Sequence, residues 1–287
     1  NYIYFCNFAP FIKERLMKDK RILFVSSELI PYLPNTEASK MAFEIPKLMQ
    51  DQGAQVRLFM PKFGVINERR HQLHEVIRLS GMNLIINDMD MPLIIKVASI
   101  PKERMQVYFI DNDDYFKRKA IYSNEDNLMY PDNDERAIFF FFFLVETVKK
   151  LKWSPDIVHV SGLLASLVPL YIKEYYKNDP LFSNSKIVTS VYNKTFEGEL
   201  DKEKMIENIK FDLLGTERIS ELEKITSDAL LKIAMDYSDA VITGSETAGP
   251  ELKKYLDAVK TPLLKYQKPE QLAESYANFY LKQVLQQ

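Results

Sequence analysis

The spacing of hydrophobic and polar residues divides the first part of the chain into a strand, a helix and a second strand. Residues 21–26 (RILFVS) are a short run rich in branched apolar residues, which is typical of a buried strand. Residues 37–50 place apolar side chains on one helical face, and residues 54–60 (AQVRLFM) form a second apolar run. This order predicts a βαβ unit and therefore a parallel sheet.

The same alternation continues to the end of the chain. Further strands are expected at 82–87, 93–99, 105–111, 157–160, 186–191 and 240–243. Helices are expected at 133–151, 163–176, 203–235 with a break near Gly215, and 247–255. The amphipathic tail, residues 269–287, predicts a helix that packs back on the rest. Together these elements predict one α/β domain, a parallel sheet flanked by helices.

Composition narrows the class of protein. Of the 287 residues, 46% are hydrophobic and 27% are charged, which is enough for a sizeable core. The net charge of -2 gives no sign of a nucleic-acid partner. A single cysteine, Cys6, excludes an intramolecular disulfide and a thiolate metal cluster. We therefore expect a reducing compartment, the cytoplasm. We also expect no metal and no cofactor. The apolar run 137–145 is too short to span a bilayer, so we expect no membrane partner.

The ends of the chain suggest three segments. Residues 1–16 are aromatic-rich and lack the basic start and cleavage site of a signal peptide, so we expect an N-terminal extension or an artefact. Residues 17–260 form the expected domain, and residues 261–287 the C-terminal helix.

Seven segments resemble the glycogen/starch synthase family in order and spacing. They are residues 20–31 (KRILFVSSELIP), 61–64 (PKFG), 109–115 (FIDNDDY), 130–136 (YPDNDER), 153–159 (WSPDIVH), 193–198 (NKTFEG) and 239–245 (DAVITGS). The resemblance implies a Rossmann-like sheet, the N-terminal lobe of a two-lobed glycosyltransferase fold. In that family the acceptor glucan lies mainly on this lobe, whereas the second lobe holds most of the donor, ADP-glucose or UDP-glucose.

The chain departs from the family in the loop that binds phosphate. Where the family has Lys-Thr-Gly-Gly-Leu and then Asp, this sequence has Pro34, Asn35, Thr36, Glu37, Ala38 and, two residues on, Lys40. A lysine has been lost, and so have the two glycines that let the backbone approach phosphate. Glu37 adds a negative charge that would repel a diphosphate.

A second departure removes the polar residues near the transferred sugar. Leu164 stands where the resemblance implies the active-site histidine, and Gly162 and Leu163 replace its acidic and aromatic neighbours. Tyr192 replaces a further histidine. Glucosyl transfer needs oriented polar groups and cations, so we expect no catalytic residues here.

Six residues remain as candidates for contact with a glucan. They are Glu28, Tyr130, Asp132, Asn133, Arg136 and Asn193. Each also has a structural interpretation: Glu28 could cap a helix, Asp132 or Asn133 could cap the helix that follows, and Arg136 could pair with an acid. His159 ends a strand and is expected to be a core histidine, while His71 and His74 are expected on the solvated face of a helix.

Three functions are compatible with this sequence. The first is a degenerate synthase lobe, a non-catalytic glucan-binding or regulatory protein of glycogen metabolism, with a maltooligosaccharide or a glycogen-metabolism protein as partner. The second is an ADP-glucose-dependent glucosyltransferase lobe, active only with a partner C-terminal lobe. The third is a protein-interaction module without sugar binding.

Overall fold

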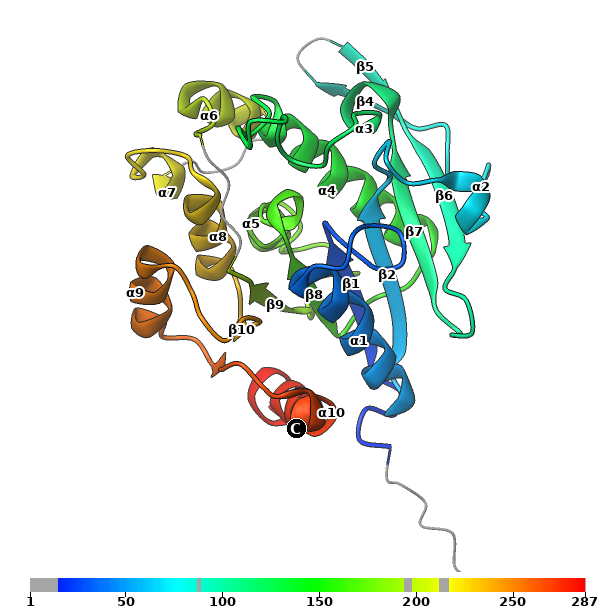
Figure 1. The fold of residues 1–287 in the computed structure, drawn as a ribbon, viewed down its shortest axis with the longest axis vertical. Coiled ribbons are helices and arrows are strands. Elements are labelled where there is room, and N and C mark those ends of the chain that lie inside the picture. Colours follow the sequence, from blue (N-terminus) through cyan, green and yellow to red (C-terminus); the bar gives the residue numbers. More distant parts are fainter. Residues whose placement is uncertain (1–14, 87–88, 194–197, 212–216, 287) are drawn as a thin grey trace, which may run out of the picture.

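The computed structural model describes residues 15–86, 89–193, 198–211 and 217–286. Its strands are β1 (Arg21–Ser26), β2 (Gln55–Pro61), β3 (His74–Glu75), β4 (Asn83–Ile86), β5 (Met89–Pro92), β6 (Ile94–Ser99), β7 (Gln106–Asp111), β8 (Ile157–Ser161), β9 (Lys186–Val191), β10 (Ala240–Thr243) and β11 (Leu263–Leu264). Nine of them form one sheet in the order β11-β10-β9-β8-β1-β2-β7-β6-β3, while β4 and β5 form a separate hairpin (Figure 1).

The sheet is mostly parallel. All pairs from β11 to β7 are parallel, and β6 and β3 are added antiparallel at one edge. From β1 the chain builds the sheet toward β2 and β7, and then returns to β8 on the other side of β1. The strand order therefore reverses between β1 and β8. In open α/β sheets, ligands bind outside the carboxyl ends of the strands at such a point.

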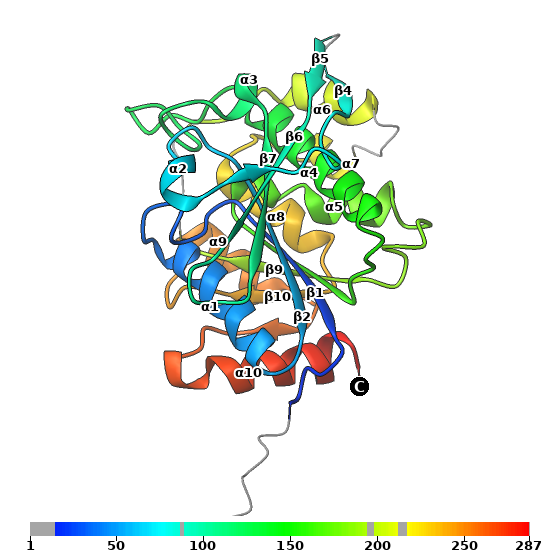
Figure 2. The ribbon, with the colours of Figure 1, turned by 90° about the vertical axis from the view of Figure 1, so that its right-hand side faces the viewer.

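Helices cover both faces of the sheet. They are α1 (Glu37–Asp51), α2 (Glu68–His71), α3 (Asp113–Phe116), α4 (Asn133–Lys150), α5 (Val168–Glu174), α6 (Lys202–Phe211), α7 (Glu217–Ser220), α8 (Ser227–Asp236), α9 (Pro250–Ala258) and α10 (Leu272–Asn278). α1 and α10 lie together on one face, and α4, α5 and α8 on the other (Figures 1 and 2). The five phenylalanines at 139–143 in α4 are all buried, so this helix lies in the core as predicted.

Some predicted boundaries are wrong. The helical stretch predicted at 203–235 is interrupted again before Ser227, where α8 begins and the Thr226 hydroxyl accepts a hydrogen bond from the Ala229 amide. The predicted helix at 163–176 begins as a single 3₁₀ turn, and α5 starts only at Val168. The helix predicted from 247 begins at Pro250, a residue favoured in the first turn. The predicted break at Gly215 lies outside the described residues.

The C-terminal helices pack against α1 at the lower end of the molecule (Figures 1 and 2). α10 continues as a π-helical segment, Phe279–Val284, and Tyr276, Phe279 and Tyr280 are buried. The segmentation expected at residues 16 and 260 stays a prediction. Among the described helices, none is long and apolar enough to cross a bilayer.

Candidate functional site

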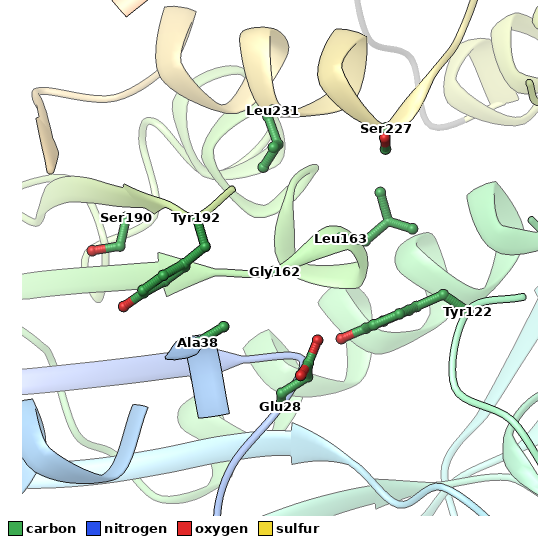
Figure 3. Close-up of a pocket in the computed structure, with 9 residues that line it drawn as sticks. All are labelled: Glu28, Ala38, Tyr122, Gly162, Leu163, Ser190, Tyr192, Ser227 and Leu231. Atoms are coloured by element: carbon green, nitrogen blue, oxygen red, sulfur yellow. The ribbon is translucent and has the colours of Figure 1, made fainter. Parts of the chain in front are cut away.

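A narrow crevice lies at the carboxyl edge of the sheet, beside the point where the strand order reverses. Glu28 follows β1, Gly162 follows β8, and Tyr192 follows β9 (Figure 3). The other lining residues are Ala38, Tyr122, Leu163, Ser190, Ser227 and Leu231. The fold thus brings together the segments that follow three strands, and residues of the helices α1 and α8, at the place where a ligand is expected.

Bulky side chains nearly fill this crevice. The remaining space is about 30 Å³, which accommodates one or two water molecules but not a sugar ring. The Tyr192 ring packs against Gly244 so closely that a Cβ at position 244 would lie 2.3 Å from it. Leu163 and Leu164 are buried as well. Of the substitutions inferred from the sequence, Tyr192 therefore adds bulk to the crevice.

Glu28 lies at the bottom of the crevice with 4% of its surface exposed. Its Oε2 accepts a hydrogen bond of 2.9 Å from the hydroxyl of Thr36, the residue that caps α1. Figure 3 shows the hydroxyl end of Tyr122 directed toward the Glu28 carboxylate. Burial and then the charge of Glu28 raise the pKa of Tyr122 well above its usual value, so the tyrosine stays protonated. Glu28 therefore supports the helix cap indirectly.

Glu37 places a carboxylate at the start of α1. Its Oε2 accepts a hydrogen bond from the Ser245 hydroxyl. The same hydroxyl accepts a hydrogen bond of 2.9 Å from the backbone N–H of Asn193. This chain of bonds ties together the loops after β1, β9 and β10. A carboxylate of the protein itself thus lies at the N-terminus of α1, a position where the helix dipole favours anions.

Arg136 and Asn133 are buried at the start of α4. The Asn133 amide donates to the Tyr122 carbonyl at 2.9 Å and accepts from Arg136 Nη1 at 2.6 Å. Arg136 also donates from Nε to the Tyr115 carbonyl at 2.9 Å, while its Nη2 finds no partner in the part of the chain that is described. Burial lowers the pKa of Arg136 to about 10. The prediction that Arg136 pairs with an acid is wrong, because an amide and a carbonyl hold it instead.

Asp132 and Tyr130 reach the surface beside this buried pair. A cap of α4 by the Asp132 side chain was one of the predicted alternatives. The side chain does not form it, because both its oxygens bind Arg118. Burial works to raise the pKa of Asp132, but the bonds from Arg118 outweigh it, so the pKa is lowered. The Arg118 guanidinium also lies 4.6 Å from the centre of the Tyr130 ring.

The six candidate residues all lie at this edge of the sheet, but they differ in access. Glu28, Asn133 and Arg136 are buried and hydrogen-bonded within the protein. Tyr130 and Asp132 are partly exposed, and the side chain of Asn193 is exposed. Sequence reasoning missed Arg118, Tyr122 and Ser245, which connect these residues. Arg118 and Tyr122 lie in a loop without periodicity, so no pattern marked them.

The histidines have structural positions. His159 accepts or donates at both ring nitrogens: Nε2 lies 2.6 Å from the Ser190 hydroxyl, and Nδ1 lies 2.6 Å from the Tyr280 hydroxyl. Burial lowers its pKa to about 3, so it is neutral, as expected of a core histidine. His71 ends α2 and His74 lies in β3, so they do not share a helix. Within the described ranges, no cluster of three potential ligands is arranged for a metal.

A mostly parallel sheet, covered by helices and with a crevice at its carboxyl edge, defines one lobe of a GT-B glycosyltransferase. The catalytic domain of starch synthase IV from Arabidopsis thaliana, solved bound to ADP and acarbose, has this fold. It superposes with a TM-score of 0.69 at 16% identity, over 88% of this chain and 52% of that one. Residues 21–259 match the family model "Starch synthase catalytic domain", so the chain belongs to this family.

Related sequences include glycogen synthases. The one from Chlorobium limicola is 34% identical over 181 residues, which are 63% of this chain and 37% of the relative. The one from Pelodictyon phaeoclathratiforme is 28% identical over 263 residues, which are 91% of this chain and 51% of the relative. The chain therefore spans about half the length, or less, of the curated relatives it matches. It is a glycogen/starch synthase-like domain.

Proposed function

We propose that this chain is a non-catalytic protein of glycogen metabolism that binds a glucan or regulates a partner. The observation that carries the proposal is the closed crevice: about 30 Å³ remain where a sugar would have to lie. Tyr192 and Leu163 fill it with apolar surface, and Glu37 supplies a carboxylate where the donor phosphates would need cations. The protein is expected in the cytoplasm, where glycogen metabolism takes place.

The surface around Tyr130 and Asp132 is the proposed contact for the glucan. Both side chains are partly exposed, and Arg118 holds them together through an ion pair and a ring contact. Such a cluster offers an aromatic face for a sugar ring and oxygen atoms for its hydroxyls. The related starch synthase IV domain was solved with acarbose, which supports a glucan-like ligand on this fold.

Isothermal titration of the purified chain with maltoheptaose, and in parallel with ADP-glucose, tests this function. We expect binding of the oligosaccharide and no binding of ADP-glucose. Asp132→Asn should weaken oligosaccharide binding by about tenfold, the loss of one charged hydrogen bond at a partly exposed site. Asp113→Asn, which removes an exposed carboxylate paired with Lys117, is the matched control and should have no effect. Glucosyl transfer from ADP-glucose by the chain alone would refute the proposal.

A second candidate function is a glucosyltransferase lobe completed by another polypeptide. Two observations favour it. The chain has the fold of a synthase lobe, and it spans about half the length of the relatives it matches. It predicts that adding a separately produced C-terminal lobe of a related synthase gives glucosyl transfer. A third candidate, an interaction module, becomes the best account if neither maltoheptaose nor ADP-glucose binds.

A further inference from the structure

A second, open groove lies next to the closed crevice. Its walls are the loop 31–34 after β1, helix α2 with the residues before it, and the loop 119–123. Its volume is about 620 Å³, within the range of roughly 300 to 1,000 Å³ that is usual for small-molecule sites. Tyr122 contributes to both cavities, but the other lining residues differ.

Ion pairs and ring contacts hold the walls of the groove in place. Glu68 on α2 binds Lys62 at 2.6 Å and Lys96 at 2.8 Å, and Lys96 also binds the buried Asp111 at 2.8 Å. The loop 31–34 also contacts α2, because the Tyr32 ring packs edge-on against His71, with 5.0 Å between ring centroids. The groove is therefore formed before any ligand arrives, which lowers the entropic cost of binding.

The groove is lined by apolar side chains and by several polar ones, among them two cations. Among the described residues that line it there is no aspartate or glutamate. Arg70 and Lys119 both line it, and neither forms an ion pair with any residue in the described ranges. Asn67 uses its Oδ1 to accept from the Arg70 amide at 2.9 Å, which leaves its amide nitrogen as a donor.

A buried hydroxyl group lies within one wall of the groove. Tyr32 is 5% exposed and lines the groove, and its hydroxyl finds no hydrogen-bond partner in the described part of the chain. Burial raises the pKa of Tyr32 well above its usual value, so the hydroxyl keeps its proton. Buried polar groups in native proteins are nearly always hydrogen-bonded, so a buried water is expected to accept from this hydroxyl, which is not accessible from the groove.

We propose that this groove binds a small phosphorylated molecule, a phosphate monoester on a compact organic body. Such a group carries a charge of about -1.5 to -2 at neutral pH and three acceptor oxygens. It therefore matches the two cations without ion pairs and the side-chain amide nitrogen of Asn67. Pro31, Pro34 and Val65 supply apolar surface for the organic body. This site is separate from the proposed glucan contact, so either one can exist without the other.

Titration calorimetry of the full chain with ribose 5-phosphate, ribose and inorganic phosphate tests the site. We expect ribose 5-phosphate to bind more tightly than inorganic phosphate, no binding of ribose, and an affinity that falls as the salt concentration rises. Arg70→Gln and Lys119→Gln should each weaken binding about tenfold, the loss of one charged hydrogen bond. Tyr32→Phe should leave the affinity unaltered, because the hydroxyl is buried and not accessible from the groove.

Lys117→Gln is the matched control. Lys117 lies two residues from Lys119, pairs with Asp113 and does not line the groove, so this change should leave the affinity unaltered. The proposal is overturned if ribose 5-phosphate does not bind at 10 mM, a concentration about tenfold above a millimolar Kd. It is also overturned if ribose or inorganic phosphate binds equally well, or if Arg70→Gln and Lys117→Gln have the same effect. Maltoheptaose binding is measured on the same variants, and Arg70→Gln should not change it.

Discussion

His159 links the centre of the sheet to the C-terminal helices through a neutral imidazole. Its two ring nitrogens contact Ser190 on β9 and Tyr280 on the last helical segment. A neutral ring provides one donor and one acceptor, which suits two hydroxyl partners. Protonation would bury a charge without a counter-ion, and this explains why burial lowers the pKa to about 3.

This depressed pKa predicts a pH dependence of stability. The unfolded chain binds a proton at His159 below about pH 6.5, whereas the folded chain does not until about pH 3. Stability from this group is therefore complete above pH 6.5 and falls by up to about 1.4 kcal/mol per pH unit as the pH drops toward 3. Urea unfolding of the wild type and His159→Gln between pH 5 and 8 should show the wild type losing more stability in acid. Parallel curves would contradict it.

Tyr280→Phe tests the other half of this contact. The change removes the hydroxyl and leaves His159 Nδ1 without a partner among the residues described. Leaving a buried polar atom unsatisfied costs about 1 to 3 kcal/mol. We expect the free energy of unfolding to fall by that amount in urea at pH 7. Tyr175→Phe, at a tyrosine with 47% of its surface exposed, is the control and should be neutral.

The start of α1 is held by a reciprocal set of hydrogen bonds. The Thr36 hydroxyl accepts from the Ser39 amide, and the Ser39 hydroxyl accepts from the Thr36 amide, which is a capping box. Thr36 also donates to the buried Glu28. One residue thus connects the helix to the crevice.

Thr36→Ala should therefore cost about 1 to 3 kcal/mol, the loss of a cap together with a bond to a buried carboxylate. The neighbouring exposed residue provides a matched control, because Asn35→Ala removes no cap and should change stability little. Denaturant unfolding of both variants would measure the difference. Equal stabilities would show that the capping box contributes nothing.

Helices α4 and α6 are joined by a carboxyl group with a raised pKa. Asp134 is buried and accepts from Asn208 at 2.9 Å. Burial raises its pKa to about 6. The folded state therefore binds this proton more tightly than the unfolded state, so the contribution of Asp134 to stability falls as the pH rises from about 4 to 6, by about 2 to 3 kcal/mol.

Asp134→Asn removes that titration. The stability of the wild type relative to this variant should decline between pH 4 and pH 7, in the opposite sense to the effect of His159. Urea unfolding at the two pH values measures it. A constant difference between the two proteins would mean that Asp134 ionises in the folded state as it does in the unfolded state.

The strongly periodic elements could be predicted from sequence. β1, α1 and β2 lie within one residue of their predicted bounds, because short apolar runs and a capped amphipathic helix carry local signals. β3 and β11 are two residues long, so tertiary pairing determines them and no local pattern marks them. Within the site, Leu164 and Tyr192 could be recognised as substitutions. That the Tyr192 ring lies on Gly244 depends on two strands meeting, which the sequence does not display.

The molecule as a whole depends on its last helical segments. Tyr276, Phe279, Tyr280 and Val284 are buried against the sheet and α1. Each fully buried side chain of this size contributes about 1.5 to 3 kcal/mol, and domains are stable by only about 5 to 15 kcal/mol.

Removing residues 269–287 should therefore prevent stable folding. We expect the truncated chain to show no cooperative thermal transition by circular dichroism, or to aggregate, because His159 and α1 lose their cover. A truncated chain that melts cooperatively near the temperature of the full chain would show that the segment is dispensable.

The carboxylate of Glu37 behaves as a ligand that the protein carries with it. Because it is tethered next to Ser245, its effective concentration at the start of α1 is that of an intramolecular group, in the millimolar range or above. Any phosphate arriving from solution must compete with it and overcome its repulsion. The anion position at this edge is therefore already occupied, and a weakly binding anion would displace the carboxylate only when its concentration far exceeds that effective concentration.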